Sequence, residues 1–170
     1  MAEEKKDYSD ILFGYLLTPA YGFFGMDDGG FSVAIYPDGR LVHKTYVFDR
    51  REKTRTEYLL PDEVIEQIAV VLEEYAPEIA DFDEHVSNGS LDGYGNFFVF
   101  NGKHIISWNI ELNDEEEVRK KNPEYYHEYL SVMQQENTML FIFYEVIEIL
   151  EKIRIKLNLH EVEIPEEYML

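Results

Sequence analysis

Residues 97–110 read FFVFNGKHIISWNI, and this stretch holds the strongest hairpin signal in the chain. Two apolar runs flank the Asn-Gly pair at 101–102, which favours a two-residue β-turn because both of its positions require positive φ. A turn of this type fixes the register of the two strands, so we expect Val99 to face His104. The stretch therefore predicts an antiparallel hairpin.

Both faces of this hairpin are apolar. Phe97 and Trp108 share a face with His104, whereas Phe98 and Ile105 lie on the other face. An antiparallel sheet with one solvated face does not require two apolar faces. Two interpretations follow: helices cover both faces, or the face with Trp108 and His104 is an exposed aromatic patch for a ligand or partner.

A meander is predicted upstream of this hairpin. Side chains alternate between apolar and polar over residues 31–36, a Pro-Asp-Gly turn follows at 37–39, and an apolar run resumes over 41–48. Residues 54–60 fit a third strand. The meander and the hairpin together give about five strands.

Two helices are predicted around the second hairpin. Residues 61–75 have apolar side chains at helical spacing, and Pro61 suits the first helical position with acids after it, whereas Pro77 is expected to end the helix. A short polar helix is expected to start at Asn113-Asp114 and to end before Pro123.

The last helix is predicted for residues 125–157. At 1.5 Å per residue it would be about 50 Å long, whereas a compact domain of this size is about 40 Å across. We therefore expect either a bend near residues 135–137 or a helix that protrudes into a partner. Its shared apolar face consists of Tyr126, Leu130, Met133, Leu140, Tyr144 and Ile147, widened by Met139, Phe143, Val146 and Leu150.

The fold class that these elements predict is α+β. We expect residues 1–170 to form a single domain, in which an antiparallel sheet of about five strands, a meander plus a hairpin, is packed by two main helices. Residues 1–30 carry no pattern that assigns them to an element.

The composition excludes several classes of protein. The chain has 170 residues, 35 acidic and 15 basic side chains, a net charge of −20 and no cysteine. Disulfides, cysteine-ligated metals and thiol nucleophiles are therefore excluded. A domain that binds nucleic acid normally carries a basic face, so no nucleic-acid partner is expected.

The chain has no sign of secretion or membrane insertion. Its first ten residues are polar with mixed charge, and no small-residue cleavage site follows the apolar run at 11–17. No run reaches the roughly 20 apolar residues that a membrane-spanning helix needs. We therefore expect a cytoplasmic protein without a membrane partner.

Charge is distributed unevenly along the chain. Residues 1–60 hold ten acids and eight bases, whereas residues 61–170 hold 25 acids and seven bases. Residues 40–55 form a small basic island, with six bases and two acids. Excess negative charge of this size favours fast, salt-sensitive capture of basic partners.

No catalytic motif is present. The glycine and serine spacings fit neither a phosphate-binding loop, a dinucleotide fingerprint nor a nucleophile elbow. The five histidines are scattered, with no two of them three or four residues apart. We therefore predict no catalytic residue, no cofactor and no metal site, and enzymatic activity is not favoured.

The leading hypothesis is a non-catalytic acidic binding or inhibitor protein that engages a basic protein partner, of the toxin-immunity or nucleic-acid-mimic type. One alternative is a small-ligand binder or enzyme with a cleft between the sheet and the last helix, near His104 and Trp108. Another is a self-assembling structural protein, in which the basic island docks on the acidic helices of a second copy. The candidate binding residues are Asp92, Tyr94, Asn96, His104, Trp108, Glu145 and Glu148.

Overall fold

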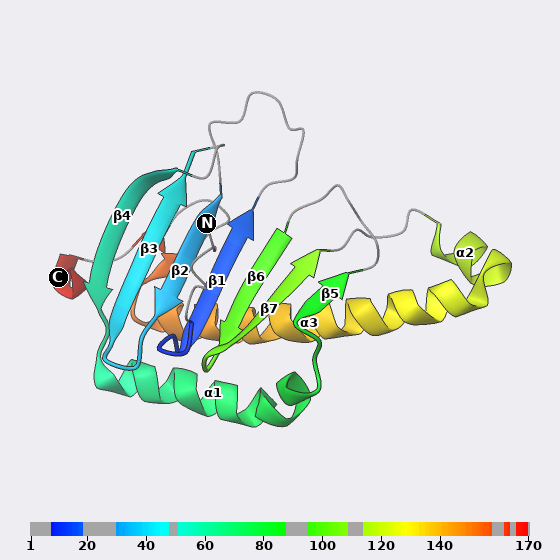
Figure 1. The fold of residues 1–170 in the computed structure, drawn as a ribbon. Helices are drawn as coiled ribbons and strands as arrows, with labels where there is room; N and C mark the ends of the chain where they lie inside the picture. The colour runs from blue at the N-terminus through cyan, green and yellow to red at the C-terminus, as the bar shows by residue number, and fades with distance from the viewer. Residues whose placement is uncertain are drawn as a thin grey trace, which may run out of the picture.

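The computed structural model shows a mixed sheet with two long helices packed on one of its faces (Figure 1). It describes residues 8–18, 30–47, 51–87, 95–108, 114–157, 162–163 and 166–169. Within these ranges the sheet consists of β1 (Phe13–Thr18), β2 (Phe31–Ile35), β3 (Arg40–Tyr46), β4 (Glu52–Leu59), β5 (His85–Ser87), β6 (Gly95–Phe100) and β7 (Lys103–Trp108). The other elements are α1 (Asp62–Ala80), α2 (Glu115–Lys121), α3 (Pro123–Lys152), the small ladder of β8 (Lys156–Leu157) with β9 (Val162–Glu163), and a 3₁₀ turn at Glu166–Tyr168.

The α+β class is confirmed, but the sheet differs from the expected one. Its order is β4-β3-β2-β1-β6-β7-β5, so the described residues form seven strands instead of about five. The sheet is also mixed, because β5 pairs with β7 in parallel while the other neighbours are antiparallel. The two unpredicted strands are β1, in the middle of the sheet, and the three-residue edge strand β5.

The hairpin of β6 and β7 has the predicted register. Val99 pairs with His104, and the turn residues Asn101 and Gly102 have φ values of 47° and 85°. The turn also contacts the start of the described chain, because the backbone N–H of Gly102 donates to the carbonyl of Ile11 at 2.9 Å. The Asn-Gly turn thus joins the hairpin to the segment that leads into β1.

Helix α1 is longer than predicted. It continues through Pro77 to Ala80, so the expectation that this proline ends the helix was wrong. Its last turn has no basic residue, but the Lys103 ammonium of β7 donates to the carbonyls of Ile79 at 2.6 Å and Phe82 at 3.0 Å. These contacts place a positive charge at the carboxyl-terminal end of α1, where the helix dipole is negative.

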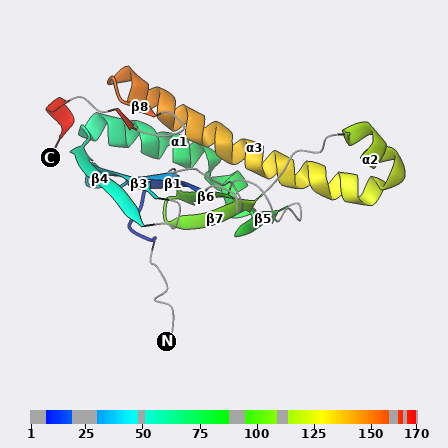
Figure 2. The same ribbon diagram turned by 90° about the horizontal axis from the view of Figure 1, so that it is seen from above.

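Helix α3 is unbroken and protrudes. It begins after Asn122, whose side chain accepts a hydrogen bond from the backbone N–H of Tyr125 at 3.2 Å. No break occurs near residues 135–137, and the first turns of the helix extend past the edge of the sheet with α2 at their end (Figures 1 and 2). The helix ends at Lys152 instead of continuing to residue 157, because Arg154 has a φ of 69°.

The buried face of α3 is rotated from the predicted one. The expected flanking residues Met139 and Val146 are completely buried, whereas Leu130 and Tyr144, expected at the centre of the apolar face, are 44% and 61% exposed. The predicted apolar face includes both the central and the flanking residues. Packing on the sheet buries mainly the flanking ones.

The core lies between the helices and one face of the sheet. Tyr15 of β1 stacks on Phe143 of α3 with 4.3 Å between ring centroids, and Phe98 packs 5.3 Å from Tyr15. Figure 2 shows α1 and α3 together on this face. Within the described residues no helix covers the opposite face, so the interpretation that helices cover both faces was wrong. We call this opposite face the open sheet face.

Candidate functional site

The predicted candidates of the second hairpin do not form one cluster. Asn96 accepts a hydrogen bond at 2.6 Å from the hydroxyl of Tyr15, whose ring packs on α3. His104 and Trp108 lie on the open sheet face, because side chains alternate along a strand. The remaining two, Asp92 and Tyr94, lie outside the described residues.

His104 is part of an aromatic stack. Its ring lies 5.9 Å from that of Phe97, with the two planes nearly parallel, and 5.4 Å from the ring of Tyr8. Burial, and then the nearby Tyr46, raise the pKa of Tyr8. The stack attaches the described start of the chain to the open sheet face, which gives His104 a packing role there.

The space between the sheet and α3 is filled beside this hairpin. Phe98 and Ile105 are completely buried there, and the hydroxyl of Ser107 donates to Glu136 of α3 at 2.6 Å. His104 and Trp108 point away from this layer. The expected cleft between the sheet and the last helix therefore does not include them.

The outer surface of α1 and α3 is strongly acidic. Helix α1 has six acidic residues and no basic one, and α3 has six acidic residues and one lysine, Lys152. All six acidic side chains of α1 are exposed. Among the described residues, the ion pairs lie in β3, β4, the turn between β2 and β3, α2 and the C-terminal segment, and none includes a carboxylate of α1. We call this surface the helical face.

A groove lies between α1 and α3 on the helical face. Its volume is about 580 Å³. The rings of Tyr75 and Phe141 meet edge to face at 6.1 Å across the two helices, and Phe141 is 54% exposed. The groove is lined by Tyr75, Glu78, Leu130, Met133, Gln134, Asn137, Thr138 and Phe141.

Carboxylates surround the aromatic residues of this groove. The hydroxyl of Tyr75 donates to Glu145 at 3.4 Å. Partial burial, followed by the negative charges of Glu145 and Glu74, raises the pKa of Tyr75, and Glu78 adds to the same shift. Glu145 was predicted as a binding residue and lies here. Glu148, three residues further along α3, is exposed on the same helix.

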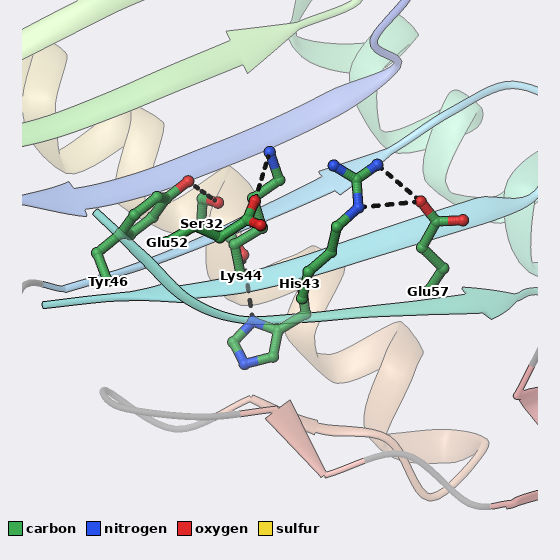
Figure 3. A network of polar contacts seen from close by, with 7 residues as sticks. Ser32, His43, Lys44, Tyr46, Glu52 and Glu57 are labelled. Atoms are coloured by element: carbon green, nitrogen blue, oxygen red, sulfur yellow. Dashed lines mark hydrogen bonds and ion pairs between the residues drawn. The ribbon is translucent and has the colours of Figure 1, made fainter. Parts of the chain in front are cut away.

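The open sheet face has different chemistry. Lys44 pairs with Glu52 at 3.3 Å, and Arg55 pairs with Glu57 at 2.7 Å. Figure 3 shows Lys44, Glu52 and Glu57 on one side of the sheet with Ser32 and Tyr46, whereas the His43 ring points to the other side. Two strand cations of the basic island, Lys44 and Arg55, therefore lie beside carboxylates.

In the turn before β3 a cation is also paired with a carboxylate. The backbone N–H of Arg40 and its guanidinium both donate to Asp38 at 3.0 Å. These two hydrogen bonds, in that order, lower the pKa of Asp38. The guanidinium also lies 4.5 Å above the ring of Tyr36, an attractive cation–π geometry.

Two kinds of feature are absent from the described part of the chain. No group of three or more histidine, aspartate or glutamate side chains is arranged there to hold a metal ion. No described helix is both long and apolar enough to cross a membrane.

The sequence matches no protein-family model and no curated protein.

None of the eight residues that line the groove was a predicted binding residue, including Tyr75, Glu78 and Phe141. Phe141 had a usable signal, since it stands outside the apolar stripe of its helix and is a large exposed aromatic residue there. Glu78 had none, because the helix was expected to end before it.

Proposed function

We propose that this protein is a non-catalytic binding protein whose helical face holds a basic segment of a protein partner, as an inhibitor or immunity-type protein would. One observation supports this most strongly: the exposed ring of Phe141 and the partly buried ring of Tyr75 meet in an open groove between two helices that carry twelve acids and one base. An apolar centre gives affinity, while a rim of one charge selects a partner of the opposite charge.

The partner that fits is an amphipathic segment rich in lysine and arginine. Its apolar side chains contact Phe141 and Leu130, and its cations meet Glu74, Glu78 and Glu145. These carboxylates already crowd Tyr75, so a cation placed beside them relieves repulsion as well as gaining attraction.

The direct test uses synthetic amphipathic helical peptides of one leucine pattern, carrying either lysines or glutamates. We expect the lysine peptide to bind, with a Kd that rises steeply between about 50 and about 300 mM salt, and the glutamate peptide not to bind. Equal binding of both peptides, or of neither, would contradict the proposal.

Three carboxylates near Tyr75, of which Glu78 also lines the groove, provide the matched variants. Glu74→Gln/Glu78→Gln/Glu145→Gln should weaken binding of the lysine peptide and flatten its salt dependence. The control Glu63→Gln/Glu66→Gln/Glu151→Gln removes the same charge from exposed positions that neither line the groove nor shift the pKa of Tyr75. Equal weakening by both triple variants would show that only net charge matters.

The basic partner itself is found by affinity capture from the native lysate with the wild-type chain and both triple variants as baits. A basic protein that the wild type and the control retain, and the groove variant loses, is the expected result. Capture of a second copy of the chain instead would favour self-assembly, which light scattering at low and high salt measures independently.

A further inference from the structure

The open sheet face contains a hollow that the proposed function does not use. Its volume is about 380 Å³, and it lies over β1, β2, β3 and β6 beside the first described residues of the chain. This volume is within the range of small-molecule sites in proteins. Its strand residues Gly14, Ala34 and Val42 belong to the open sheet face, whereas α1 and α3, which form the groove, pack on the other face (Figure 2).

Short side chains create the hollow. Val99, Gly14, Ala34 and Val42 are successive register partners across four strands, so they form one row over the sheet. The two middle residues of the row are Gly14, which has no side chain, and Ala34, whose side chain is a single methyl group. Gly14 cannot easily be larger, because an added Cβ would lie 3.1 Å from the Cβ of Val99.

The next row of the same face supplies polar groups. Leu16, Ser32, Lys44 and Arg55 are again successive register partners, so Lys44 and Arg55 lie directly opposite each other on β3 and β4. Like charges in directly opposite positions of a sheet repel each other. A chain of net charge −20 nevertheless places two cations together here.

Lys44 and Arg55 each pair with one carboxylate, and each has more N–H donors than this pairing uses. The Nε and one Nη of Arg55 both donate to the same oxygen of Glu57, at 3.2 and 2.7 Å. A guanidinium has five N–H donors and an ammonium three, so these contacts use only part of the capacity of the pair. The side chains of Lys44 and Arg55 are 30% and 48% exposed, so an incoming anion can reach both.

Aromatic side chains form the walls. Tyr8, Tyr36, Tyr46 and Phe97 line the hollow, and the hydroxyls of Tyr46 and Ser32 lie 2.8 Å apart on the same side of the sheet as Lys44 (Figure 3). Flat walls over a floor of methyl groups fit a flat apolar body, and the cations with the hydroxyls fit an anionic group at its end.

We propose that this hollow binds a small organic anion with a flat aromatic body and a carboxylate or phosphate group. The body lies on the row of Gly14 and Ala34, and the anionic group lies between Lys44 and Arg55. This site is independent of the groove on the helical face, so either proposal stands if the other fails.

The test is an NMR titration with naphthyl phosphate, naphthoate and the neutral naphthalenemethanol, which share one ring system. We expect amide shifts in β1, β2, β3 and β6 with both anions, and a Kd about tenfold or more higher for the alcohol, since charged hydrogen bonds are lost. The tighter of the two anions identifies the preferred anionic group. Equal affinity for all three probes, shifts confined to α1 and α3, or no shifts at millimolar probe would overturn the proposal.

Three variants locate the interaction. Lys44→Gln/Arg55→Gln should raise the Kd for both anions about tenfold or more while leaving that for the alcohol unchanged. The control Lys120→Gln/Lys121→Gln removes two cations of α2 that also pair with carboxylates, and should change nothing. Ala34→Leu fills the floor and should weaken all three probes. If the first variant and its control bind the anions equally, the assigned anion position is wrong.

Discussion

The helical face and the open sheet face differ in how their charged side chains are paired. On the helical face there are many acids and almost no bases, and three carboxylates lie near the ring of Tyr75. On the open sheet face Lys44 and Arg55 each lie beside a carboxylate. The near-neutral first 60 residues supply most of the open face, and the acidic remainder supplies both helices. A charge difference along the sequence thus becomes a difference between two sides of one molecule.

The largest expected effect comes from two neighbouring phenylalanines on opposite sides of β6. Phe98 faces the helices and is completely buried, so Phe98→Ala should lower the free energy of unfolding by about 3–5 kcal/mol. Phe97 packs on Tyr8 and His104 on the open face, so Phe97→Ala should cost roughly 1 kcal/mol. Urea denaturation measures both, and equal losses would show that the open face is as buried as the core.

The next largest effect on stability is expected at Lys103, which links β7 to the end of α1. Lys103→Met removes the donors to the carbonyls of Ile79 and Phe82, which should lower stability by about 2 kcal/mol as charged hydrogen bonds are lost. Hydrogen exchange should show the loss in the last turn of α1 first. An unchanged last turn would mean that Lys103 does not hold this helix end.

A smaller effect separates binding from stability. Phe141 is half exposed in the groove, so Phe141→Ala should change the free energy of unfolding by less than about 0.5 kcal/mol. The same change should raise the Kd of the lysine peptide about tenfold, as for a modest interface contact. Calorimetric titration and urea denaturation of the one variant give both numbers. A loss of stability without a loss of affinity would assign Phe141 to the core instead.

The smallest effect is a pH dependence in the shared core. Burial, and then the nearby Tyr144 and Glu136, raise the pKa of Tyr15 in the folded state. The unfolded chain then loses this proton first, so the contribution is complete below pH about 10 and decreases as the pH rises further. Tyr15→Phe removes a hydrogen bond to Asn96, which should cost up to about 1 kcal/mol at neutral pH.

Urea midpoints between neutral and strongly alkaline pH test this prediction. The wild type should lose more stability than Tyr15→Phe over the alkaline part of the range, because other tyrosines with a raised pKa, such as Tyr8 and Tyr75, are common to both. Parallel pH profiles of the two proteins would refute the assignment to Tyr15.

Local signals predicted the strands that have one dominant turn or alternation. The Asn-Gly turn fixed the register of β6 and β7, and the alternation over residues 31–36 located β2. Strand β1 lacked such a signal, because its centre is buried on both faces and reads as a continuous apolar run around Gly14. Strand β5 is three residues long and pairs in parallel, which only the tertiary structure determines.

The acidic character of the candidate site could be predicted from the sequence, but the residues that lie together in it could not. The sequence showed that acids dominate residues 61–170 and proposed Glu145 for binding. It did not show that Tyr75 would lie beside Glu145, because 70 residues separate them and only the packing of α1 on α3 brings them together. The opposed pair of Lys44 and Arg55 likewise depends on the register of β3 and β4.

The protruding start of α3 gives one helix a gradient of local stability. Six of its seven buried residues lie from Met139 onward, and only Tyr129 is buried in the earlier turns. Local opening of the early turns therefore exposes little apolar surface, so their amides exchange with solvent long before those of the second half. Leu130 and Met133 of the groove lie within these early turns. A partner bound in the groove would slow the exchange of these amides. The boundary between slowly and rapidly exchanging amides of α3 would then move toward the start of the helix.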